Sequence, residues 1–134
     1  MSSLKGSSLP LKSVADVLIA RQLVRQWCID LKFSSVDQTK MVTAASELAR
    51  NTIEHGGGGT LTLEVVENGT KTGLRLIFED QGPGIADVEL AMKGGYKTAS
   101  GMGLGLGGSK RLTNEFEIDT KPGQGTRITV IRWK

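Results

Sequence analysis

The chain has 134 residues, of which 38% are hydrophobic and 23% charged, with a net charge of +3. These values fit a single domain over residues 1–134 with one hydrophobic core. Lys and Arg are scattered and aromatic residues make up 4% of the chain, so we expect no nucleic-acid partner. No stretch approaches the roughly 18 apolar residues of a membrane span. Residues 1–10 lack the apolar run of a signal peptide, so we expect a cytoplasmic protein without a membrane partner.

The first elements in chain order are an edge strand and a helix. A short strand is predicted over Ser7 to Lys12, where Pro10 restricts it to a sheet edge. Ser13 is the predicted N-cap of a helix that ends near Leu31. Cys28, the only cysteine, lies on the apolar pattern of this helix, which indicates a buried packing residue and excludes an internal disulfide. The helical spacing comes from six apolar positions: Val14, Val17, Leu18, Val24, Cys28 and Leu31.

A second helix and a hairpin follow. Ser35 and Gln38 have the form of a capping box, and the helix that they open continues to about His55, where four glycines stop it. Two strands with alternating apolar residues come next, and Asn68-Gly69 between them is typical of a hairpin turn. The apolar faces of the two strands consist of Leu61, Leu63 and Val65, and of Leu74, Leu76 and Phe78.

The last third of the chain predicts two short helices and two strands. The helices are expected over Ala86 to Met92 and through Lys110 to Leu112. The strands, Phe116–Thr120 and Thr126–Trp133, flank a turn that contains proline and glycine. The sum of these elements is an α+β two-layer sandwich, with a mixed, mostly antiparallel sheet and helices on one face.

Two short segments combine acidic side chains with residues suited to binding a nucleotide. On the second helix Glu47, Asn51 and Glu54 form one polar stripe, because about 100° per residue places them on one side. After the second strand of the hairpin comes Asp80-x-Gly82-x-Gly84. A carboxylate there can accept a hydrogen bond from the amine of adenine, and glycines allow close approach of the backbone. Each segment alone is more typical of a solvated helix edge or an ordinary turn.

A third segment alternates glycine with apolar residues from Gly101 to Gly108, just before a predicted helix. Free backbone N–H groups at such a position suit phosphate oxygens, and the Met and Leu residues argue against a solvated linker. The P-loop sequence is absent. Gly103-x-Gly105-x-x-Gly108 matches the dinucleotide pattern only formally, because no strand precedes it and no acidic residue follows at the right distance.

In this order and spacing, the three segments resemble the N, G1 and G2 boxes of the ATP-binding superfamily that contains Hsp90, the histidine kinases and MutL. The resemblance implies a Bergerat-type ATP-binding fold. Within the superfamily the sequence resembles the bacterial anti-sigma-factor and switch-protein serine kinases, including the RsbT-like stressosome kinases. The matching segments are Glu47–Asn51, Glu79–Ile85, Lys110–Leu112 and Gly123–Thr126, with Val36–Gln38 and Ala20–Leu23 for the stressosome branch. The pair His55-Gly56 is equally similar to kinases that bind sigma factors directly.

The resemblance implies a role for each matching residue. Glu47 would be the general base, and Asn51 would bind ATP phosphates through Mg²⁺, which prefers oxygen ligands. Asp80 would bind the adenine amine, with support from Thr126. The glycines would allow close approach of the backbone to the nucleotide or cover its triphosphate: Gly82, Gly84, Gly101, Gly103, Gly105 and Gly107. Arg50 is a candidate for contact with phosphate or with a partner, whereas Lys97 and Lys110 are more typical of a solvated surface than of phosphate contacts. His55 is expected to cap its helix or to pack rather than to catalyse.

The implied function is an ATP-dependent protein serine/threonine kinase in a bacterial stress or sigma-factor switch. Its expected substrate is a STAS-domain antagonist or scaffold protein, and it is also expected to activate a PPM-type phosphatase. The alternative is an anti-sigma factor that sequesters a sigma factor directly. A histidine-kinase catalytic domain is a third interpretation, which the sequence opposes because 134 residues leave no room for a phosphoacceptor helix pair.

Overall fold

The computed structural model describes residues 2–92 and 106–134. Its five strands form one sheet in the order β1-β2-β3-β5-β4. All four described strand pairs are antiparallel, so the expected α+β class is confirmed, whereas the parallel pairing that we allowed for does not occur among them. Two of the pairs, β2 with β3 and β4 with β5, are hairpins, which can only be antiparallel. The strands are β1 (Ser2–Leu11), β2 (Gly59–Asn68), β3 (Lys71–Asp80), β4 (Glu115–Thr120) and β5 (Thr126–Trp133).

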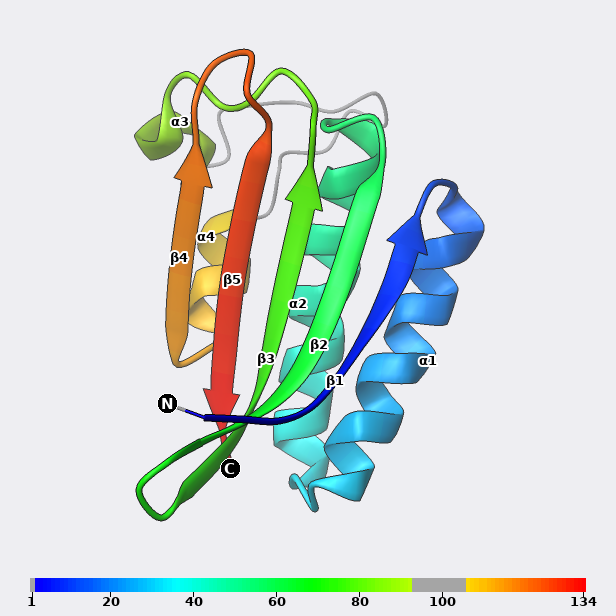
Figure 1. The fold of residues 1–134 in the computed structure, drawn as a ribbon, viewed down its shortest axis with the longest axis vertical. Coiled ribbons are helices and arrows are strands. Elements are labelled where there is room, and N and C mark those ends of the chain that lie inside the picture. Colours follow the sequence, from blue (N-terminus) through cyan, green and yellow to red (C-terminus); the bar gives the residue numbers. More distant parts are fainter. Residues whose placement is uncertain (1, 93–105) are drawn as a thin grey trace.

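The helices lie on one face of the sheet, as expected, and the view in Figure 1 looks onto the other face. The long helix α2 packs against α1, β2 and β3, and α1 lies at the same edge as β1. No helix in the described parts of the chain is long and apolar enough to cross a membrane. The helices are α1 (Val14–Asp30), α2 (Ser35–Glu54), α3 (Val88–Met92) and α4 (Leu106–Arg111).

The core forms between the sheet and α2. Alternate side chains of β2 and β3 point to this side, and the two apolar faces predicted from the sequence are buried. The arc of α2 beside the polar stripe is also buried, at Met41, Ala44, Ala45 and Leu48. Cys28 is buried as predicted, and burial raises the pKa of its thiol to about 12, so the thiolate is suppressed at neutral pH.

Three details differ from the sequence-based expectation. Strand β1 begins at Ser2 rather than Ser7, because it pairs with the whole length of β2. The N-cap of α2 is Ser34 rather than Ser35: its hydroxyl accepts a hydrogen bond from Asp37 N at 3.1 Å. In α1, Val14 and Leu18 are exposed, although they belong to the apolar pattern that indicated the helix.

A charged pair ties the C-terminal strand to the start of α2. Arg132 Nη2 donates to Asp37 Oδ1 at 2.7 Å, and Arg132 Nη1 donates to the Leu112 carbonyl at 3.0 Å. The hydrogen bond from Arg132 is the main reason that the pKa of Asp37 lies below its ordinary value. The pair therefore joins three elements that are distant in the sequence.

We expect Asp37→Asn to lower the free energy of unfolding at pH 7 by on the order of 1 kcal/mol. A depressed folded-state pKa stabilises the fold above the unfolded value of about 3.9, and this contribution is lost as pH falls through the folded pKa. Urea unfolding at pH 7 and at pH 3 measures both effects. The exposed variant Asp30→Asn is the control, and an equal loss for Asp37→Asn at both pH values would contradict the assignment.

Candidate functional site

A small pocket lies between the C-terminal half of α2 and the adjoining ends of β3 and β5. It brings together Asn51, Asp80 and Thr126, which come from three separate segments of the sequence. Asp80 and Thr126 are direct partners in the antiparallel pairing of β3 with β5, and α2 packs across β3. The other lining residues are Thr52, His55, Phe78, Ile85, Leu106 and Ile128. Three of the residues predicted to form one site are therefore neighbours.

Asp80 is the buried carboxyl group of this pocket. Its burial raises the pKa, and three weaker effects oppose the rise: the backbone N–H of Gly82, the charge of His55 and the backbone N–H of Thr126. The bond from Gly82 N to Asp80 Oδ1 is 2.9 Å long. A carboxylate has about four acceptor positions, so Asp80 can still accept a hydrogen bond from a ligand in the pocket.

Backbone packs closely on backbone beside Asp80. A Cβ atom on Gly56 would overlap the Asp80 carboxyl group, and a Cβ on Gly82 would lie 2.7 Å from Gly56 Cα. Gly84 has φ of 73°, a conformation that side chains disfavour. The close approach at Gly82 is thus to the protein's own loop after α2. Both loops require glycine before any ligand is considered.

A threonine pair links β4 to β5 beneath the pocket. Thr120 Oγ1 donates to the Gly125 carbonyl at 3.0 Å and accepts from Ile85 N at 2.9 Å. Because the single hydroxyl proton of Thr120 is used, Thr126 Oγ1 donates across the 2.8 Å that separates the two hydroxyls. The hydroxyl of Thr126 is therefore bound to Thr120. The hydrogen bond that Thr126 donates to Asp80 comes from its backbone N–H. Sequence reasoning missed Thr120, although its position opposite Thr126 in the last hairpin is a signal that would have indicated it.

His55 connects the end of α2 to the loop after β3. It is the C-cap of α2, as expected, and its Nε2 lies 3.1 Å from the Gly84 carbonyl oxygen. A carbonyl only accepts, so Nε2 carries the proton and donates it. His55 therefore holds two walls of the pocket together.

Glu47 lies one helical turn before Asn51 and is not among the residues that line the pocket. Its Oε1 forms an ion pair with Arg50 Nη1 at 3.1 Å, and both side chains are partly exposed. The predicted stripe on α2 is therefore divided: Asn51 is buried at the pocket, while Glu47 is engaged by Arg50 beside it. Arg50, a candidate for phosphate contacts, is occupied by this pair.

The glycine-rich segment lies mostly outside the described residues, including Lys97 and the predicted site residues Gly101, Gly103 and Gly105. Gly107 is in α4, where a Cβ atom would overlap the Met92 carbonyl. The pocket encloses about 10 Å³, which is no more than the volume that one water molecule needs. The described residues therefore leave no space for a nucleotide base in this pocket.

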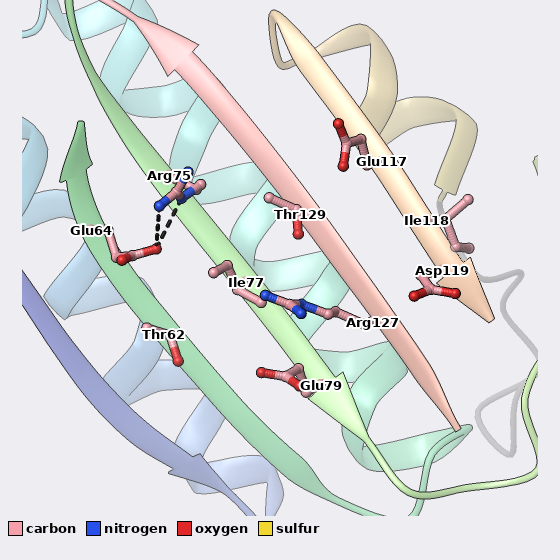
Figure 2. Close-up of a pocket in the computed structure, with 10 residues that line it drawn as sticks. All are labelled: Thr62, Glu64, Arg75, Ile77, Glu79, Glu117, Ile118, Asp119, Arg127 and Thr129. Carbon is pink, nitrogen blue, oxygen red and sulfur yellow. Dashed lines mark hydrogen bonds and ion pairs between the residues drawn. The ribbon is translucent and has the colours of Figure 1, made fainter. Parts of the chain in front are cut away.

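A larger hollow of about 640 Å³ lies on the opposite face of the sheet, as Figure 2 shows. It is lined mainly by charged and polar side chains, including the ion pair between Glu64 and Arg75. Glu79 and Arg127 point to this face because their neighbours Asp80 and Thr126 point to the other. None of the predicted site residues that the structure describes lines this hollow. The smaller pocket, which holds the buried carboxyl group, is therefore the candidate site.

Comparison with known proteins agrees with the fold and the pocket. Residues 36–134 match the family described as histidine kinase-, DNA gyrase B- and HSP90-like ATPases. The chain therefore belongs to this family of ATP-binding proteins. It is 46% identical over 118 residues to the serine/threonine-protein kinase RsbT of Bacillus subtilis (strain 168), an alignment that covers 88% of this chain and 89% of that protein. The chain is a serine/threonine-protein kinase homologous to RsbT.

Two solved structures are similar in fold. A structure of the RsbU and RsbW domains of a Mycobacterium tuberculosis protein gives a TM-score of 0.61 with 19% identity over 96% of this chain. This chain spans only 32% of that protein's length. A structure of the SiaB-SiaC complex from Pseudomonas aeruginosa gives a TM-score of 0.54 with 13% identity, covering 98% of this chain and 91% of that one. At these identities the similarity concerns the fold alone.

Proposed function

We propose that the chain, acting as one domain over residues 1–134, transfers the γ-phosphate of ATP to a serine or threonine of a STAS-domain protein. The observation that carries this proposal is the pocket in which Asn51, Asp80 and Thr126 meet, in a chain 46% identical to a serine/threonine-protein kinase. RsbT-like kinases operate in stressosome switches, which is why the substrate that we propose is a scaffold or antagonist of this class.

Asp80 recognises the adenine amine in this proposal, because its carboxylate is the buried acceptor of the pocket. Glu47 accepts the proton of the substrate hydroxyl. For that, its carboxylate must be released from Arg50, which is three residues away on the same helix. Positioning and charge stabilisation account for most of phosphoryl transfer, so the protein supplies few reacting groups. The glycine-rich segment 101–108 covers the triphosphate.

Mg²⁺ fits the donors at this site through Asn51. Asn51 lines the pocket, and its side-chain amide contains an oxygen of the hard type that Mg²⁺ prefers. The described residues contain no cluster of three His, Cys, Asp or Glu side chains that could hold a metal alone. Mg²⁺ usually keeps waters and binds through one or two protein ligands plus phosphates. Bound there, it would offset the negative charge of the phosphates.

The test is to follow label from γ-phosphate-labelled ATP in the presence of a cognate STAS-domain protein. We expect the label on the STAS protein, in a linkage that is stable in acid as a phosphoserine or phosphothreonine ester is. The control is the same STAS protein with its candidate serine or threonine replaced by alanine. Acid-labile label, or label mainly on this chain, would contradict the proposal.

Co-purification separates the remaining alternatives. A STAS protein and a PPM-type phosphatase in the purified complexes support the switch-kinase function in a cytoplasmic pathway. A stoichiometric complex with a sigma factor would instead support direct sequestration, the function suggested by the pair His55-Gly56.

A further inference from the structure

The outer side of α1 is unusually apolar. Six large apolar side chains are exposed in the described part of the chain, and four of them lie on this one helix. Their exposed fractions are 74% for Val14, 55% for Leu18, 45% for Ile19 and 47% for Ile29. Single exposed apolar residues are ordinary, but several of them on one helix indicate an interaction surface.

Three of the four form a straight line along the helix. Val14, Leu18 and Ile29 are separated by 4 and 11 residues, spacings that return to nearly the same side at about 100° per residue. At a rise of 1.5 Å per residue the line is ~22 Å long. The neighbouring side of α1 is buried against the rest of the protein: Val17, Ala20, Val24, Trp27 and Cys28. Helix α1 is therefore apolar on two sides, and Figure 1 shows that it lies at the edge of the molecule.

Positive charge occupies the middle of this line. Arg21 and Arg25 are exposed, and neither forms an ion pair within the residues that the structure describes. The acidic residues of α1 are at its two ends and are already engaged. Asp16 accepts hydrogen bonds from the backbone of Lys12 and Ser13, and Asp30 accepts one from Gln26. The exposed line is thus apolar at both ends and basic between them.

We propose that this line, consisting of Val14, Leu18, Arg21, Arg25 and Ile29 and called here the α1 stripe, binds an amphipathic helix of a partner protein. The partner helix carries apolar residues that pack on Val14, Leu18 and Ile29, and acidic residues opposite the two arginines. A narrow line with these spacings is the shape of a helix–helix seam, in which one helix lays its apolar face against another.

A second copy of this chain is a poorer occupant of the α1 stripe. Arg21 and Arg25 lie near the middle of the line. An antiparallel two-fold pairing would therefore bring the arginines of both copies together, and like charges in contact oppose association. An acidic partner turns the same arginines into favourable contacts.

The α1 stripe is separate from the nucleotide pocket, so the proposal does not rest on the proposed function. No residue of α1 lines the pocket. Substitutions on the outer side of α1 therefore leave ATP binding unchanged, and ATP affinity serves as an internal measure that each variant is intact.

The experiment uses the full chain and two designed helical peptides of 21 residues. Both peptides have Leu and Ile along one face; one has Glu at the flanking positions and the other has Lys. We expect fluorescence anisotropy to show at least tenfold tighter binding of the Glu peptide. Leu18→Glu should weaken that binding at least tenfold. The double variant Arg21→Glu/Arg25→Glu should reverse the preference in favour of the Lys peptide.

Leu90→Glu is the matched control, because Leu90 is an exposed apolar residue on α3. It should leave peptide binding unchanged, and all variants should keep the wild-type ATP affinity. Equal binding of the two peptides, or no reversal in a folded double-arginine variant, overturns the proposal. Two other results also overturn it. One is binding to phosphatidylserine vesicles that Leu18→Glu abolishes; the other is a concentration-dependent dimer that the same variant dissociates.

Discussion

Asp80→Asn is expected to abolish measurable ATP binding while the protein remains folded. Asn keeps an oxygen that can accept from Gly82 N, so the loop after β3 is retained. Its amide nitrogen, however, can present a donor to the adenine amine, which is itself a donor. Losing a buried complementary pair costs about 1–3 kcal/mol or more, which corresponds to roughly 5–150-fold or more in affinity. Calorimetric titration with ATP measures the loss.

The control for this variant is Glu79→Gln, because Glu79 is the preceding residue on β3 and points to the opposite face of the sheet. It should bind ATP as the wild type does. Unchanged ATP affinity in folded Asp80→Asn would show that the adenine site is elsewhere.

The thermal stability of Asp80→Asn tests whether the Asp80 carboxyl group is buried. Burial raises the pKa of Asp80, so ionising this residue costs more in the folded than in the unfolded state, and the stability of the fold falls as pH rises through the folded pKa. The variant, which cannot ionise, should therefore resist thermal unfolding at pH 7 at least as well as the wild type. At pH 3 the thermal stability of the wild type should rise relative to that of the variant. A variant clearly less stable at pH 7 would argue that the ionised carboxylate holds the loop together.

Glu47→Gln is expected to keep ATP bound and to lose roughly 10²–10⁴ in the rate of phosphotransfer. Gln has nearly the same size and can remain beside Arg50, but it cannot accept the proton of a substrate hydroxyl. Because Glu47 does not line the base pocket, the nucleotide affinity should change little. Single-turnover transfer to the STAS partner, measured at saturating ATP, isolates this step.

Two variants of the same helix serve as comparisons. Glu54→Gln, seven residues later on α2, should transfer phosphate at the wild-type rate. Asn51→Ala should instead weaken the Mg²⁺-dependent part of ATP binding, since Asn51 is buried at the pocket. If Glu47→Gln phosphorylates the partner as fast as the wild type, another residue is the base.

Sequence patterns alone were sufficient to predict the helix and the strands that carry the site. The strand faces of β2 and β3 follow from a period of 2.0 residues and are buried as predicted, and the polar stripe of α2 follows from a period of 3.6 residues. The spacing of Glu47 and Asn51 and the motif Asp80-x-Gly82-x-Gly84 are equally local. Both patterns can therefore be recognised without coordinates, whereas the meeting of Asn51 and Asp80 in one pocket was inferred from resemblance.

Contacts between distant segments were decided only by the tertiary structure. Neither the bond from His55 to Gly84 nor the packing of Gly56 on Asp80 has a periodic signal, because each joins residues from segments that are far apart in the sequence. The same holds for the ion pair between Asp37 and Arg132, which are 95 positions apart.

The two sides of α1 show most clearly what sequence periodicity cannot predict. Apolar residues at helical spacing predicted the helix, but the same pattern contains Val17, which is buried, and Val14 and Leu18, which are exposed. Periodicity places residues on the faces of a helix and does not say which face has a neighbour. Only the packing of α1 against α2, at the edge of the fold, determined which apolar side is covered and which remains open to solvent.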